Sequence, residues 1–173
     1  SDVCSSDLYM KEQREALGGS LPVRGGDADQ LDPPDNTLFD EFREGTGERE
    51  VSTTMVFVSI LSKLLADDAW GERIVPIIAD EARTFGMESL FRTYGIYSHP
   101  GQLYEPVDRK NLLYYRELKE GQIIEEGITE AGAMGTFIAA GTSYSNHGLA
   151  MLPFFTFYSM FGTQRIGDLV WAA

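Results

Sequence analysis

The sequence predicts an α/β domain built on a mostly parallel sheet flanked by helices. Short apolar segments alternate along the chain with longer segments of helical periodicity, and no internal repeat interrupts that order. Such alternation is typical of parallel sheets, because parallel neighbours must be joined by a crossover of a dozen residues or more. We expect strands at residues 74–78, 122–126 and 151–157.

The helices are predicted from apolar spacing and from the residues that begin and end them. A Ser-Thr-Thr cap followed by apolar residues three and four apart predicts a helix from about residue 53 to Gly71. Other helices are expected at residues 9–17, through Met87 to Gly95, at 129–140, and from about Gly162 onward. Pro76 in the first strand has no amide donor, so it favours a strand start or a sheet edge.

Residues 18–47 are rich in Gly, Pro, Asp and Glu and have no clear period. A loop of that length is unusual inside a compact domain, so we interpret it as a linker between two bodies. Residues 1–48 are therefore assigned to an unpatterned leader, a short helix and an interdomain linker, and residues 49–173 to the α/β domain. The last helix has no stop signal, and we expect the domain to be incomplete at that end.

The composition excludes several classes of protein. The chain has 173 residues with 14 Lys and Arg against 27 Asp and Glu, a formal net charge of −13. This balance disfavours nucleic acid and anionic membranes as partners, since both select basic surfaces. The longest apolar stretch is too short and too interrupted to span a membrane. Cys4 is the single cysteine and lies in the leader, so we assign it no role. A chain with one cysteine cannot form an internal disulfide, which fits the reducing cytoplasm.

Motifs for metals and nucleophiles are missing from the sequence. It contains no C-x-x-C, H-E-x-x-H or P-loop pattern. His99 and His147 are far apart in sequence and flank Gly or Pro, so we expect them in surface loops.

Ligands of parallel α/β sheets bind beyond the carboxyl ends of the strands. Glu130 follows the second predicted strand and opens an Ala/Gly-rich helix. It can be a first-turn acid that the helix dipole stabilises by roughly 0.3–1 kcal/mol. Alternatively, burial raises its pKa and makes it a proton-holding group near neutral pH.

Two further positions follow strand ends. Asp80 and Glu81 can be a helix cap with a first-turn acid, or a pair that binds or protonates a polar substrate. Most of the aromatic residues at 154–161 are expected in the core. Tyr158 and Phe161 lie past the strand end and are free to stack on a planar ligand.

Five segments together resemble the homodimeric bacterial pyruvate dehydrogenases, the decarboxylating component of the pyruvate dehydrogenase complex. They are YMKEQREALGG, IVPIIADEARTFGMESLF, GIYSHPGQLYEPVDR, GQIIEEGITEAGAM and PFFTFYSMFGTQRIGDLVWAA. In addition, G-I-T-E is similar to the Gly-Ile-x-Glu signature of transketolase-like enzymes. The resemblance implies the pyrimidine-binding domain of a transketolase-like, thiamine-diphosphate-binding fold.

The resemblance also implies roles for individual residues. Glu130 matches the glutamate that hydrogen-bonds the aminopyrimidine ring of the cofactor and shares a proton with it. Asp80 and Glu81 match an acidic pair that lines the active site near the substrate, so these three are the expected catalytic residues. Tyr158 and Phe161 match aromatics around the ring. The expected cofactor-binding residues are Glu130, Tyr158, Phe161 and, in a less defined role, Arg165.

The implied activity is thiamine-diphosphate-dependent oxidative decarboxylation of pyruvate, with acetyl transfer to the lipoyl domain of a dihydrolipoyl acetyltransferase. In this family the active site is assembled between two subunits of a homodimer. The diphosphate and Mg²⁺ half requires a Gly-Asp-Gly…Asn motif, and the family has catalytic histidines; this sequence contains neither. We therefore expect the Mg²⁺ ligands outside this chain and no activity from it alone. The alternatives are a transketolase-like enzyme with another substrate and a non-catalytic binding module of the same fold.

Overall fold

A computed structural model describes residues 5–19, 28–107 and 114–173. Cys4 and parts of the predicted leader and linker lie outside these residues. The α-helices are α1 Ser5–Ala16, α2 Asp40–Arg43, α3 Thr53–Leu65, α4 Glu88–Tyr94, α5 Glu130–Gly141, α6 Ser143–His147 and α7 Ser159–Ala172. The strands are β1 Ile74–Ile78, β2 Ile96–Tyr97, β3 Glu117–Leu118, β4 Ile124–Glu125 and β5 Leu152–Thr156. Short 3₁₀ helices cover Asn36–Phe39, Gly71–Arg73 and Ala82–Phe85.

The sheet is parallel, as predicted, and β1 is its central strand. The order is β4-β1-β5, with Ile78 paired in register to Glu125 on one side and to Thr156 on the other. Strands β2 and β3 form a second parallel pair, and an isolated bridge between Ile96 and Ile123 connects that pair to the β4 side. The predicted α/β architecture is confirmed.

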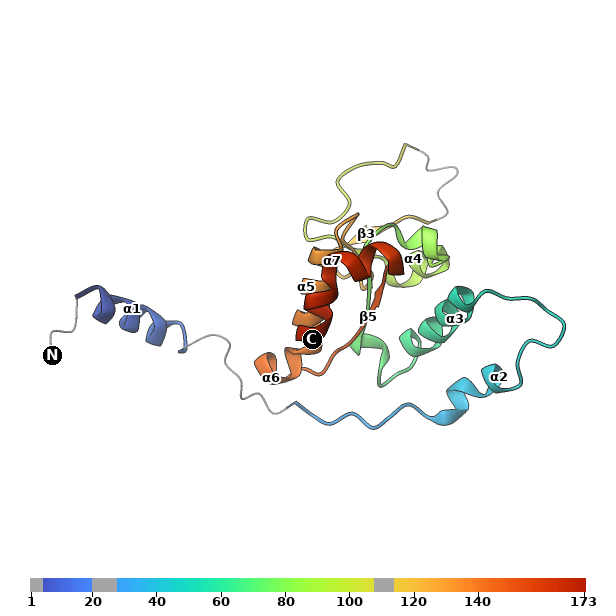
Figure 1. The fold of residues 1–173 in the computed structure, drawn as a ribbon, viewed down its shortest axis with the longest axis horizontal. Coiled ribbons are helices and arrows are strands. Elements are labelled where there is room, and N and C mark those ends of the chain that lie inside the picture. Colours follow the sequence, from blue (N-terminus) through green and yellow to red (C-terminus); the bar gives the residue numbers. More distant parts are fainter. Residues whose placement is uncertain (1–4, 20–27, 108–113) are drawn as a thin grey trace.

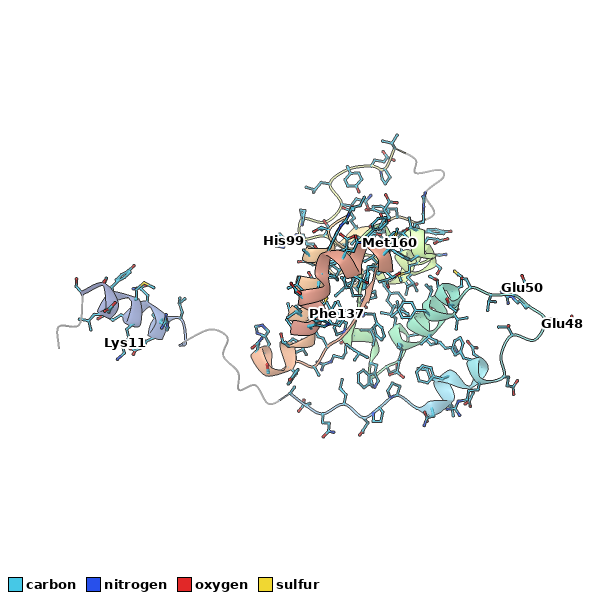
Figure 2. The ribbon with its side chains drawn as sticks, in the orientation of Figure 1. Lys11, Glu48, Glu50, His99, Phe137 and Met160 are labelled. Carbon is cyan, nitrogen blue, oxygen red and sulfur yellow. The ribbon has the colours of Figure 1, made fainter. Side chains whose placement is uncertain are left out.

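Helices cover both faces of the sheet (Figure 1). Residues along β1 alternate between the two core clusters that lie on these faces. Ile74 and Ile78 belong to the larger core cluster, which they share with α3 and α4. Ile77 belongs to a smaller cluster with Ala133 of α5, and Phe137 of the same helix packs against it (Figure 2). Because β1 is buried on both faces, it reads in the sequence as a continuous apolar run rather than an alternating one.

Pro76 lies in the middle of the central strand, so the expectation of a strand start or edge was wrong. The carbonyls of Ile74 and Ile78 both face β4, because they accept bonds from the side chain of Gln122 and from the Glu126 N–H. Alternate residues of a strand face the same neighbour, so the nitrogen of Pro76 also faces β4. Pairing with β4 begins only at Ile77, and the missing donor therefore costs no ladder hydrogen bond.

Three helix boundaries differ from the prediction. α1 begins at Ser5 rather than at residue 9, so the described end of the predicted unpatterned leader is helical. α3 ends at Leu65, and the chain then turns so tightly that a Cβ on Gly71 would lie 2.5 Å from the Leu65 carbonyl oxygen. α7 begins at Ser159 rather than near Gly162. Gly162 instead lies within the helix, where the ring of Phe157 packs directly against its backbone. β2 and β3 were not predicted, since two residues are too few to show a period.

The described part of the predicted linker packs against the domain. Leu38 and Phe39 contact the larger core cluster, and the indole Nε1 of Trp70 donates to the Asp32 carbonyl at 2.8 Å. Lys63 of α3 lies 3.3 Å from Glu41 of α2. In contrast, α1 has no buried residue, and Figure 1 shows it away from the sheet.

Candidate functional site

The carboxyl ends of β1, β4 and β5 meet at one edge of the sheet, because these strands are parallel and in register. Each strand feeds one of the predicted site segments. Asp80 and Glu81 follow β1, Glu130 follows β4 by five residues, and Tyr158 comes two residues after β5. The strand-end residues selected from the sequence therefore share one edge of the sheet.

Glu130 is the first residue of α5 and is almost fully buried, with 8% of its surface exposed. Thr129 caps this helix by accepting the Gly132 N–H at 3.3 Å. The guanidinium Nη1 of Arg165, from the second turn of α7, lies 2.7 Å from both carboxylate oxygens of Glu130. The side chain of Arg165 stays about half exposed and lies over the ring of Phe161, 5.6 Å from its centroid.

This ion pair favours the first of the two hypotheses for Glu130, an acid held ionised in the first turn of a helix. The hydrogen bond from Arg165 lowers the pKa of Glu130, assisted by the backbone N–H of Glu130 itself, and burial opposes them with a smaller effect. The sequence-based hypothesis of a pKa raised by burial is thus wrong for this structure, because it omitted the arginine. The carboxylate is held ionised at the start of a helix, where the dipole also favours negative charge.

Asp80 and Glu81 lie on the turn between β1 and the 3₁₀ helix Ala82–Phe85. Glu81 occupies the N-cap position of that helix, yet its side chain makes no capping hydrogen bond. Its carbonyl accepts from the Thr84 N–H at 2.9 Å. The carboxylate of Glu81 is consequently not used for capping and lines a cavity of about 280 Å³.

Tyr158 and Phe161 are each 46% exposed, although both are large aromatic residues. The ring of Tyr158 packs against that of Phe85, with 5.0 Å between the centroids. Tyr158 also lines a second, more open cavity of about 640 Å³. That cavity lies between the N-terminus of α3, the Ala82–Phe85 helix and the N-terminus of α7. Its wall shares Arg83 with the smaller cavity.

Two residues at this edge were missed from the sequence. Glu125, the last residue of β4, lines the smaller cavity together with Glu81. The sequence signal for it was a pair of adjacent Glu residues at the end of a predicted strand. Ile128 lies two residues before Glu130 and is 80% exposed. His99 and His147 are exposed, as expected, but His147 is the last residue of α6 rather than part of a loop. Among the described residues, no group of three or more His, Cys, Asp and Glu side chains is arranged to hold a metal ion.

The sequence agrees with one known family over most of its length. The sequence model described as "Pyruvate dehydrogenase E1 component middle domain" matches residues 30–173. The chain belongs to this family. The match begins within the predicted linker, in the segment whose residues Leu38 and Phe39 pack on the core.

Relatives within the pyruvate dehydrogenase E1 family are close in sequence. The chain is 59% identical over 165 residues to the pyruvate dehydrogenase E1 component of Pseudomonas aeruginosa, covering 95% of this chain and 19% of that protein. It is 55% identical over 166 residues to the protein of the same name from Cupriavidus necator, covering 95% and 18%. For Escherichia coli K12 the identity is 51% over 166 residues, covering 95% and 19%.

The chain spans about a fifth of the length of these curated relatives. Within the part of the chain that the structure describes, no helix is long and apolar enough to cross a membrane.

Proposed function

We propose that this E1 middle domain forms the half of an active site that holds the aminopyrimidine ring of thiamine diphosphate. The full-length protein would be a pyruvate dehydrogenase E1 component that oxidatively decarboxylates pyruvate and transfers the acetyl group to a lipoyl group. The observation that carries this proposal is the buried, ionised Glu130 at the carboxyl edge of the sheet, in a chain of this family.

The residues present fit such a ring chemically. A planar nitrogen heterocycle needs an acceptor for a ring proton and apolar surface against its faces. Glu130 supplies the acceptor, and exposed apolar surface is available from Ile128, Tyr158 and Phe161. When bound, thiamine diphosphate supplies the electron sink that stabilises the carbanion left by decarboxylation.

Arg165 sets how Glu130 can act. A single guanidinium nitrogen contacts both carboxylate oxygens, so each oxygen retains lone-pair capacity for a further donor. Glu130 would accept a hydrogen bond from a ring N–H, while Arg165 orients the carboxylate and keeps it ionised. Asp80 and Glu81 would bind or protonate the substrate from the end of β1.

The remaining parts of the active site would come from elsewhere in the enzyme. We propose that another domain carries the diphosphate and Mg²⁺ site, and that two subunits of a homodimer assemble each active site. The acetyl acceptor would be the lipoyl domain of a dihydrolipoyl acetyltransferase. A single cysteine in 173 residues supports a reducing compartment such as the cytoplasm.

Turnover assays on the full-length protein test this function. With thiamine diphosphate and Mg²⁺, we expect carbon dioxide release from pyruvate and acetylation of an added lipoyl domain, and no ketol transfer between sugar phosphates. The 173-residue chain alone should give neither reaction. Sugar-phosphate turnover would favour the transketolase-like alternative, and failure of the full-length protein to bind the cofactor would favour a binding module.

A further inference from the structure

Glu125 connects two strands at the edge that carries the site. It is the last residue of β4, and its Oε1 accepts the backbone N–H of Ala82 at 2.7 Å. Ala82 is fully buried and follows directly on Asp80 and Glu81. This hydrogen bond therefore ties the end of β4 to the turn that carries the acidic pair, across a distance of 43 residues in sequence.

The surroundings of Glu125 are rich in negative charge. Glu81 lies on the wall of the same cavity, and Asp80 and Glu117 are close enough to act on Glu125 electrostatically. Two tyrosine hydroxyls, of Tyr104 and Tyr115, donate to Glu117 Oε1 at 2.6 and 3.0 Å. The cationic residue on this cavity wall is Arg83, which is exposed.

These surroundings make Glu125 a weaker acid than usual. Burial raises the pKa of Glu125, and the charges of Glu81, Glu117 and Asp80 raise it further, while the hydrogen bond from Ala82 works in the opposite direction. A protonated carboxyl keeps a carbonyl oxygen that can accept the Ala82 N–H. Protonation thus changes the charge at this place without removing the anchor.

We propose that Glu125 is a positioning residue for the Asp80–Glu81 turn, which it anchors through the Ala82 N–H, and that its ionisation adds a third negative charge beside the pair. This inference rests on the proposed function, in which the pair acts on the substrate. Two separable effects follow. Loss of the acceptor displaces the turn, whereas loss of the charge alone removes the repulsion between Glu125 and the acidic pair.

Glu125→Gln and Glu125→Ala in the full-length protein separate the two effects. Gln keeps an acceptor for Ala82 but cannot ionise, and Ala removes both. Glu126→Gln is the matched control, since the adjacent Glu126 bonds Thr136 of α5 instead. The measurements are kcat/KM for pyruvate against pH and the melting temperature against pH.

For Glu125→Gln we expect kcat/KM within about threefold of wild type, because the side-chain oxygen that accepts the Ala82 N–H is kept. Glu125→Ala should lose about tenfold or more, because a buried N–H is left unpaired and the turn shifts. The control should reproduce the wild-type profile. A Glu125→Gln variant that loses as much kcat/KM as Glu125→Ala, or a Glu125→Ala variant with wild-type kcat/KM, overturns the proposal.

Melting temperatures keep the test independent of the reaction. A carboxyl with a raised pKa destabilises the fold once it ionises, so its cost is present above its folded pKa and absent below the pKa of the unfolded chain. Glu125→Gln should therefore melt higher than wild type at pH 8 and at the same temperature near pH 4. Absence of pyruvate turnover in wild type would refute the proposed function alone. Equal melting temperatures of Glu125→Gln and wild type at pH 8 would refute the ionisation of Glu125.

Discussion

One guanidinium nitrogen of Arg165 lies 2.7 Å from both carboxylate oxygens of Glu130. The pair links the first turn of α5 to the second turn of α7, and these two helices lie side by side on one face of the sheet (Figure 1). Glu130 is buried while Arg165 is half exposed. The guanidinium of Arg165 is therefore still partly solvated, although it forms an ion pair with a carboxylate that is buried at the start of α5.

Arg165→Met should raise the pKa of Glu130, because it removes the group that lowers it most. Any limb of the profile of kcat/KM against pH that requires an ionised Glu130 then moves to higher pH. The stability effect has a defined sign: a lowered pKa stabilises the fold above the ordinary value of 4.5, and that contribution disappears as the pH falls through the folded value.

The melting temperature of Arg165→Met should accordingly lie below that of wild type at pH 7, and the difference should shrink on acidification. Arg14→Met is the control, since α1 has no buried residue. A difference between Arg165→Met and wild type that stays constant from pH 7 to pH 3 would contradict the assignment of this ion pair.

Gly162→Ala tests the packing of α7 on the end of β5. A Cβ at this position would overlap the ring of Phe157, so the ring or the helix must move. We expect a destabilisation of about 1–3 kcal/mol, as for other overpacked sites. Gly167→Ala in the same helix meets nothing within 4 Å and should stabilise by up to about 1 kcal/mol. Denaturant unfolding of both variants measures this difference in stability. Equal unfolding midpoints for Gly162→Ala and Gly167→Ala would refute the packing argument.

Trp70→Phe tests whether residues 28–43 are held on the domain. The substitution keeps an aromatic ring but removes the indole donor to Asp32, at a cost of about 0.5–1.5 kcal/mol. Limited proteolysis should then cut within residues 28–52 faster than in wild type. Trp171→Phe is the matched control, because that side chain is 87% exposed. Unchanged cleavage in Trp70→Phe would mean that other contacts hold this segment.

The sheet could be predicted because its signals are local. β1 and β5 are five-residue apolar runs, and the helices between them carry caps and apolar spacing. The position of Pro76 could not be predicted, since it depends on where β4 starts to pair, which the sequence of β1 does not encode. The two-residue strands β2 and β3 were missed for lack of length.

Several residues of the candidate site could be selected from the sequence, but the electrostatics of the site could not be predicted. Glu130 could be selected because it follows a strand and opens a helix. The sign of its pKa shift required Arg165, which lies 35 residues further on and meets it only through the packing of α7 against α5. Glu125 was passed over for a similar reason, because its partner Ala82 is 43 residues away.

The central claim is that Glu130 is the proton partner of the aminopyrimidine ring, and turnover of Glu130→Gln in the full-length protein tests it most directly. Asp168→Asn, an exposed carboxylate on α7, is the control. We expect Glu130→Gln to fold like wild type and to lose about 10²–10⁴-fold in kcat for pyruvate decarboxylation, as for other acid–base residues. The control should retain wild-type kcat. A Glu130→Gln enzyme with near-normal kcat would contradict the role of Glu130 and the assignment of this domain's site.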